Sequence, residues 1–232
     1  MRFRNSNPVF RAVDTNSVSM DGAVTYTNVA FKTLLLVLIA AGVGVYTYTK
    51  LATLATLTNL IIAIVVGFIS VIIGTRSVKL APVFSIIYAV SEGFVLSVIS
   101  YLYASFYEGI IPTAISTTVI VLLITMLMYS SGMVKVTSRF TSFLVIGLIS
   151  VIIMSLLSLV FPFGGTFYYL IVGFSALLSV LFLFLDFENI KTCVDAGTDQ
   201  SYSWILALGL MVTLVWIYVE ILRLLAIFGR RR

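Results

Sequence analysis

Three carboxylic acids lie inside long apolar stretches of this sequence: Glu92, Asp186 and Glu220. A charged side chain at the centre of a membrane helix costs about 2.5 to 3.5 kcal/mol, so such residues usually face a partner or water and mark a functional site. Carboxyl groups that meet in a low-dielectric site cannot all ionise, and they exchange protons in coupled steps. Their oxygens also suit Ca²⁺. The three acids therefore predict a proton-dependent cation pathway. A cluster of hydrogen-bonded acids that only holds helices together would show the same pattern.

Glu92 lies deepest in its apolar stretch. It is twelve residues beyond Leu80, which is about 18 Å along a helix that rises 1.5 Å per residue. At that depth its side chain can neither reach the polar surface nor cap the helix. Ser91 and Gly93 beside it leave space for a neighbouring helix or for water. The alternative to a functional role is a neutral, hydrogen-bonded acid that joins two helices.

The other two acids have simpler alternative explanations. Asp186 lies near the end of its stretch with Glu188 two residues further on, as an interfacial residue that ends a helix would. Glu220 has Arg223 three residues later on the same helix face, which permits an ordinary ion pair. Asp186, Glu92 and Glu220 are therefore candidate proton-sensing or ion-pathway residues, with Arg223 as a candidate ion-pair partner.

Seven apolar runs must position these acids. The chain of 232 residues is 61% hydrophobic and 10% charged, whereas soluble domains are about 25% charged. Runs such as 34–45 and 177–185 are apolar on every side, unlike soluble helices, and they lack the alternation of membrane-barrel strands. The seven runs span 29–49, 59–75, 80–103, 111–129, 140–161, 166–187 and 202–228. We predict an all-α integral membrane protein with a cytoplasmic lead at 1–28, a seven-helix membrane domain at 29–228 and a basic tail at 229–232.

Lys and Arg residues occur between the apolar runs and form no continuous patch. The net charge of +5 therefore indicates orientation in a bilayer, and we expect no nucleic-acid partner. If the runs alternate in direction, nine of the 14 Lys and Arg residues fall on the side of the N-terminus and five on the other. The nine are Arg2, Arg4, Arg11, Lys32, Arg76, Lys79, Lys135, Arg139 and Lys191. We expect a multi-pass protein of the cell membrane with a cytoplasmic N-terminus and an external C-terminus.

The residue types that are scarce exclude several kinds of chemistry. The sequence has one cysteine, Cys193, and no histidine, so an internal disulfide and metal sites built on His or Cys clusters are excluded. The usual catalytic base is missing as well. An intramembrane aspartyl protease needs two aspartates inside apolar helices, and Asp186 is the only one. We therefore expect no enzymatic activity and no cofactor.

Short motifs in four places add a resemblance to this pattern. The sixth run ends in Asp-Phe-Glu-Asn-Ile-Lys at 186–191, and the seventh contains Glu-Ile-Leu-Arg-Leu-Leu at 220–225. With Asn-Pro-Val-Phe at 7–10 and Tyr-Ala-Val-Ser-Glu-Gly at 88–93, the chain resembles the Bax inhibitor family, in particular its bacterial branch and its pH-sensitive calcium-leak members. The resemblance implies a bacterial inner membrane and a fold in which the last helix is central and the other six wrap it in two three-helix layers.

The resemblance also implies a mechanism, from which this sequence departs at one position. Family members of this kind are Ca²⁺ leaks gated by two aspartates that share a proton, one late in the sixth helix and one in the seventh. The first corresponds to Asp186, whereas the second falls ten residues before Arg223, at Thr213. Threonine cannot share a carboxyl proton, so Glu220 or Glu92 would have to supply the second carboxylate. The family's latch for the closed state, a basic residue near the start of the third helix, has its nearest match in Arg76.

These observations predict a pH-regulated cation channel. We expect a Ca²⁺ leak or a Ca²⁺/H⁺ exchanger that is controlled by protonation of buried carboxylates. Calcium and protons would be the transported ions, and Asp186, Glu92 or Glu220 would be the site that binds calcium. The alternative is an interaction protein that modulates a membrane protease or a stress-response partner. Its contact surfaces would be the lead and the polar connection predicted at 188–200.

Overall fold

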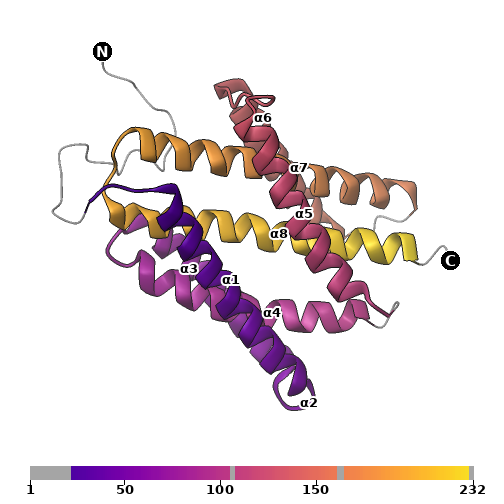
Figure 1. The fold of residues 1–232 in the computed structure, drawn as a ribbon. Helices are drawn as coiled ribbons and strands as arrows, with labels where there is room; N and C mark the ends of the chain where they lie inside the picture. The colour runs from indigo at the N-terminus through magenta and orange to yellow at the C-terminus, as the bar shows by residue number, and fades with distance from the viewer. Residues whose placement is uncertain (1–21, 105–107, 161–164, 230–232) are drawn as a thin grey trace. The chain divides into compact units, whose positions relative to one another are not determined.

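The structure, a computed structural model, describes residues 22–104, 108–160 and 165–229 (Figure 1). Most of the predicted lead and the last three residues of the predicted tail lie outside the described residues. The described elements are α1 (Tyr26–Thr49), α2 (Leu51–Leu54), α3 (Leu57–Arg76), α4 (Ala81–Ala104), α5 (Ile110–Ser130), α6 (Ser138–Val160), α7 (Thr166–Asp195), the 3₁₀ helix η2 (Gln200–Tyr202) and α8 (Ser203–Gly229).

Seven helices in the described part of the chain are long and apolar enough to cross a membrane. They confirm the prediction of an all-α protein with seven crossing segments. Threonine side chains fix the starts of α1, α3 and α6: the hydroxyls of Thr25, Thr56 and Thr137 accept hydrogen bonds from the backbone amides of Asn28, Asn59 and Phe140. Such caps satisfy amides that have no partner within the helix.

The end of α7 differs from the sequence prediction. We expected a polar loop from 188 to 200, but the helix continues to Asp195. Its 30 residues correspond to about 45 Å, more than the roughly 30 Å of a hydrocarbon core. The polar residues therefore belong to a part of the helix that extends past the apolar layer, where Lys191 and Asp195 pair at 3.3 Å. Polarity alone was the wrong criterion for a loop here.

The chain divides into two compact units. Unit 1 comprises 1–98 and 189–211, and unit 2 comprises 99–188 and 212–232. Helix α8 contributes its first residues to unit 1 and the remainder to unit 2. It is the most buried of the seven crossing helices: 61% of an 18-residue apolar stretch within it is buried, against 44% for the corresponding stretch of α4, the next highest.

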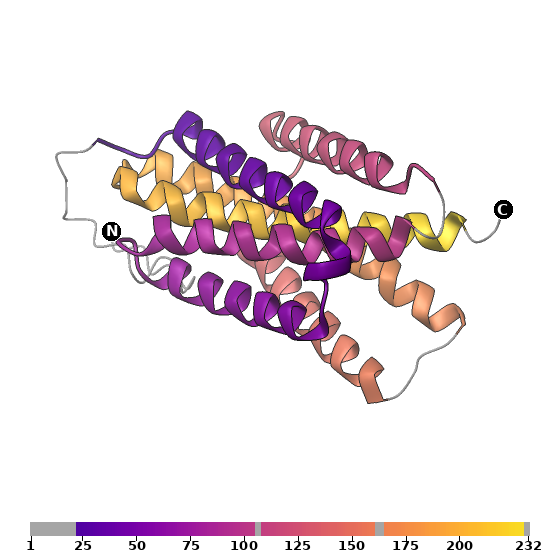
Figure 2. The ribbon, with the colours of Figure 1, turned by 90° about the horizontal axis from the view of Figure 1, so that it is seen from below.

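In unit 1, small residues bring α1, α3 and α4 close together (Figures 1 and 2). A Cβ atom on Gly93 of α4 would lie 2.4 Å from the carbonyl oxygen of Ala40 in α1, so the two backbones touch there. On α3, a Cβ atom on Gly67 would meet Ser91 of α4 at 3.5 Å. Such close approach is how membrane helices gain packing energy in the absence of a hydrophobic driving force.

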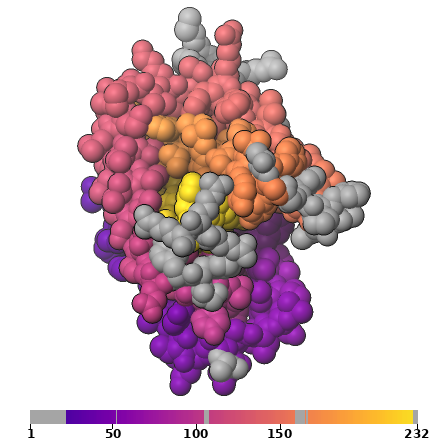
Figure 3. Space-filling model, turned by 90° about the vertical axis from the view of Figure 1, so that its right-hand side faces the viewer, coloured from indigo at the N-terminus to yellow at the C-terminus, as the bar shows by residue number. Residues whose placement is uncertain are grey.

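In unit 2, α7 and the second part of α8 run side by side, and the side chains of the two helices adjoin in the space-filling view (Figures 1 and 3). The rings of Phe182 and Trp216 lie 5.6 Å apart between them. Helix α6 joins α7 where Gly147 faces the Leu178 side chain. Helices α7 and α8 carry two of the three candidate acids, Asp186 and Glu220.

Candidate functional site

Asp186 of α7 lies beside Thr213 of α8 in unit 2. The two side chains are hydrogen-bonded, and Thr213 is 5% exposed. The Oδ2 atom of Asp186 is buried and has no hydrogen-bond partner in the described part of the chain. A buried polar atom without a partner is uncommon and needs an explanation, such as a water, an ion or a proton.

Glu220 of α8, in contrast, is surrounded by donors. Its Oε1 accepts hydrogen bonds from the Ser175 hydroxyl of α7 at 2.7 Å and from the Trp216 indole at 3.3 Å. A guanidinium nitrogen of Arg223 lies 3.2 Å from each carboxylate oxygen. Glu220 is 3% exposed. Because all three partners donate, the arrangement suits an ionised carboxylate that ties α8 to α7.

Glu92 belongs to unit 1, where it faces Tyr88 on its own helix. The Tyr88 side chain, 4% exposed, is hydrogen-bonded to the Glu92 carboxyl group one turn later. A Cβ atom on Gly67 of α3 would lie 3.6 Å from Glu92 Oε1, so this acid lies at the contact of α3 with α4. Small residues, Gly67 and Ser91, surround the acid, and its hydrogen-bond partner, the Tyr88 hydroxyl, is neutral.

A fourth acid, Glu188, lies two residues beyond Asp186 on α7. It accepts a hydrogen bond of 2.7 Å from the Tyr129 hydroxyl of α5, and the ring of Tyr129 lies 5.8 Å from that of Phe187. Glu188 is therefore anchored to another helix and offers a comparison for Asp186.

The sequence matches the family model described as Bax inhibitor 1 like over residues 7–230. The chain belongs to the Bax inhibitor family. A comparison with curated proteins gave no match. Together with the seven apolar helices, family membership makes it a multi-pass membrane protein.

The structure of this Bax inhibitor protein brings some of the candidate residues together and not others. Asp186 and Thr213 meet, and Glu220 meets Arg223. No hydrogen bond joins Glu220 to Asp186 among the described residues, and Glu220 lies seven residues from Thr213, about 10 Å along α8. Arg76, the candidate latch, ends α3 in unit 1 and has an exposed side chain.

Three residues of these sites escaped the sequence analysis. Tyr88 and Trp216 each lie four residues before an acid, and this spacing places them on the same helix face. This spacing alone is enough to predict that Tyr88 and Trp216 are partners of Glu92 and Glu220. Ser175, by contrast, is 45 positions from Glu220, and only the packing of α7 against α8 reveals it.

Proposed function

We propose that this protein is a pH-regulated Ca²⁺ leak of the cell membrane, in which Asp186 binds and releases the controlling proton. The observation that carries the proposal is the buried Oδ2 of Asp186, which lacks a partner within the described residues. A protonated carboxyl group is neutral there, whereas an ionised one is a charge without compensation. Loss of the proton therefore favours a different arrangement, in which the carboxylate meets water or a cation.

The conformational change would involve α7 and the adjoining part of α8. Thr213 presents only a hydroxyl to Asp186, so no second charge fixes that contact. About two turns away, Glu220 is held by Ser175 of α7 and by Arg223. A ligand or proton shifts an equilibrium only by its different affinity for the two states. Asp186 has that property in this proposal, whereas the donor-rich Glu220 acts as a fixed tie.

Calcium is the ion that family membership favours, and carboxyl and hydroxyl oxygens are the ligands it prefers. In the ranges that the structure describes, no group of three or more His, Cys, Asp or Glu side chains could hold a metal ion. Conduction requires binding weak enough for the ion to leave. Single acids that do not cluster bind Ca²⁺ only weakly. Weak binding suits a leak better than a Ca²⁺-storage site.

For orientation, we place the N-terminus in the cytoplasm, because more Lys and Arg residues fall on that side of the membrane. The membrane would be the plasma membrane or the inner membrane of a bacterium. Arg76 and Lys79, at the end of α3 and in the turn after it, would then face the cytoplasm.

The decisive experiment measures Ca²⁺ entry into liposomes that contain the purified full chain, between about pH 6 and pH 8. We expect flux in the wild type to change with pH and flux in Asp186→Asn to be independent of pH, because an amide cannot titrate. Glu188→Gln is the matched control, since it removes a neighbouring carboxylate that is anchored to Tyr129, and it should keep the wild-type pH profile. Flux no greater than that of empty liposomes at every pH would refute the proposal.

Thr213→Asp provides the complementary test of the same site. It places a second carboxyl group beside Asp186, and two such groups titrate in coupled steps. We expect the flux of this variant to depend on pH over a wider range than that of the wild type. A leak, unlike an exchanger, should also persist when an ionophore removes the pH gradient. An unchanged profile in Thr213→Asp would mean that Asp186 does not control flux.

A further inference from the structure

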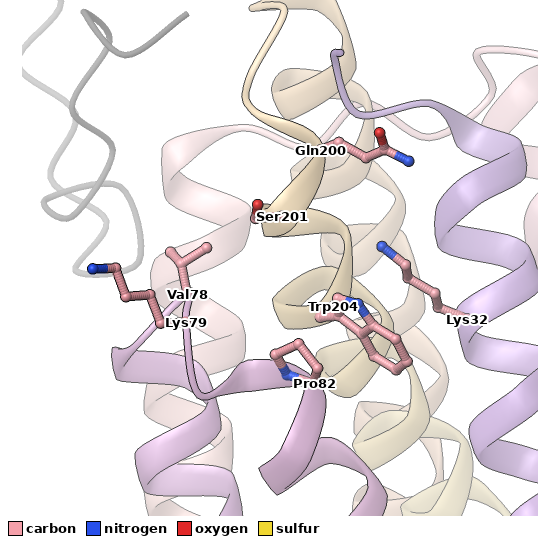
Figure 4. A pocket seen from close by; sticks show the side chains of 7 residues that line it. All are labelled: Lys32, Val78, Lys79, Pro82, Gln200, Ser201 and Trp204. Carbon is pink, nitrogen blue, oxygen red and sulfur yellow. The ribbon is translucent and has the colours of Figure 1, made fainter. Parts of the chain in front are cut away.

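A cavity of about 360 Å³ lies in unit 1 where four helix ends meet. The four are the first turns of α1, the turn after α3, the start of α4 and the start of α8 together with η2. Its polar and aromatic lining side chains are Lys32, Lys79, Gln200, Ser201 and Trp204 (Figure 4). This cavity is separate from the three acids discussed above.

Lys32 supplies a cation that is held in place. Its ammonium group donates a hydrogen bond to the Ser203 hydroxyl, which in turn donates to the Gln200 carbonyl oxygen. The same ammonium lies 5.0 Å from the centre of the Trp204 ring, and Figure 4 shows the two side chains facing each other from α1 and α8. An ammonium group has three donors. One is used by Ser203, so donors remain for a ligand.

Lys79 supplies a second cation, at the edge of the cavity. Its side chain is exposed and directed away from Trp204 (Figure 4), and it makes no ion pair within the described part of the chain. The lysine side chain has a flexible stem of four carbons, so its ammonium group can turn toward a ligand. The cavity is therefore bordered by one fixed and one adjustable positive charge.

Among the residues that the structure describes, no carboxylate lines the cavity to neutralise these charges. The closest acid in sequence, Asp199, precedes Gln200 and is half-buried. Its Oδ1 accepts a hydrogen bond of 2.8 Å from the Ser201 amide, and hydrogen bonding by Ser201 lowers the pKa of Asp199. That carboxylate is engaged with its own turn, so within the described residues the two lysines are the charges that the lining presents to a ligand.

The cavity lies at one face of the membrane. If successive crossing helices alternate in direction, the starts of α1, α4 and α8 and the end of α3 all fall on the same side. Lysine and tryptophan are the side chains that prefer the level of lipid headgroups. A ligand of this cavity would thus lie at headgroup depth, on the side where Lys and Arg are more numerous.

We propose that this cavity binds a phosphate group. Lysine is a common phosphate ligand as a point charge, and the Gln200 side-chain amide adds a neutral donor. The volume is within the range of small-molecule sites and has room for more than a bare phosphate. The phosphate of an anionic phospholipid headgroup fits this position, whereas free phosphate would reach the cavity from the aqueous side.

The test is titration of the detergent-solubilised full chain with phosphatidylglycerol, followed by native mass spectrometry. We expect Lys79→Gln to weaken lipid binding about fivefold, which is the effect of one lysine at an anionic surface. Lys32→Gln should weaken it at least as much. Lys50→Gln is the matched control, because Lys50 is exposed at the opposite end of α1 and does not line the cavity. Phosphatidylcholine gives the baseline of non-specific lipid binding.

Inorganic phosphate distinguishes the two sources of the ligand. If millimolar phosphate raises the melting temperature of the wild type but not of Lys79→Gln, and the lipid titrations are equal, the ligand is a soluble phosphate. If the lipid titration depends on Lys79, it is a headgroup. Equal binding of both ligands by wild type, Lys79→Gln and Lys50→Gln overturns the proposal. Lys79 is exposed, so its variant should fold even if Lys32→Gln does not.

Discussion

Asp186 and Glu220 lie on the same pair of helices but differ in the partners that surround them. Asp186 has a threonine hydroxyl and a buried oxygen without a partner in the described residues. Glu220 has three donors, one of them a cation. Since an ionised carboxylate needs donors and a protonated one does not, the two acids suit opposite charge states. The same helix pair can thus hold one fixed charge and one exchangeable proton.

Glu220→Gln tests the role of the fixed charge. The amide keeps an acceptor for Ser175 but leaves Arg223 without its carboxylate. Because the Arg223 side chain is 32% exposed, water offsets part of the loss, and we expect the free energy of unfolding to fall by about 1 to 3 kcal/mol. Unfolding of the purified chain by sodium dodecyl sulfate, added to mixed micelles, measures this change.

The exposed pair of Lys191 with Asp195 is the control for Glu220→Gln. Both of its side chains are at least half exposed, and surface pairs contribute about 0.2 to 1 kcal/mol. Asp195→Asn should therefore cost clearly less than Glu220→Gln. Equal costs would show that Glu220 is not a structural tie between α7 and α8.

The partner of a buried acid can be predicted from the sequence when it lies on the same helix or at a motif position. Arg223 was foreseen as a partner of Glu220 from its spacing, and the motif register put Thr213 opposite Asp186. Ser175 could not be foreseen, because which faces of α7 and α8 meet depends on packing across the whole unit. An all-round apolar helix carries no periodic signal to orient it.

At the scale of elements, glycine decides how closely α1 and α4 approach. A Cβ atom at position 93 would lie 2.4 Å from the Ala40 carbonyl oxygen and 3.0 Å from the Val43 Cβ. The obstacle is largely backbone, so a flexible side chain cannot simply move aside. The contact can accept a larger residue only if the two helices separate.

Gly93→Ala is therefore expected to destabilise unit 1. Overpacking of this kind costs about 1 to 3 kcal/mol, and the same detergent unfolding experiment measures it. Gly42→Ala is the matched control, because a Cβ atom there meets nothing within 4 Å. It should leave the free energy of unfolding unchanged or slightly raise it through better helix propensity. If the two variants behaved alike, the close contact of α1 with α4 would not be a determinant of stability.

The elements themselves were largely predictable, because about 20 apolar residues in a row specify a crossing helix. The exception is the end of α7. A helix that leaves the apolar layer can continue in water, where i,i+4 pairs such as Lys191 with Asp195 support it. Hydropathy marks where the membrane ends, and it does not mark where the helix ends.

At the scale of the whole molecule, the Lys and Arg residues in the turns determine which way the chain crosses the bilayer. Lys50 lies between α1 and α3, on the side with fewer positive charges. Lys135 lies in the turn between α5 and α6, on the side with more. Both side chains are exposed. The two positions therefore report on opposite faces of the membrane.

Cysteine labelling at these two positions tests the orientation. The native Cys193 is 3% exposed, so the unmodified chain should react little with a membrane-impermeant maleimide and serves as the background. Retention of positive charge in the cytoplasm predicts that Lys50→Cys is labelled several-fold above background in intact cells, and Lys135→Cys only after the membrane is opened. The reverse pattern would place the N-terminus outside. It would also move the proposed phosphate site to the external face, where the supply of anionic lipid differs, so the orientation decides which leaflet must provide its ligand.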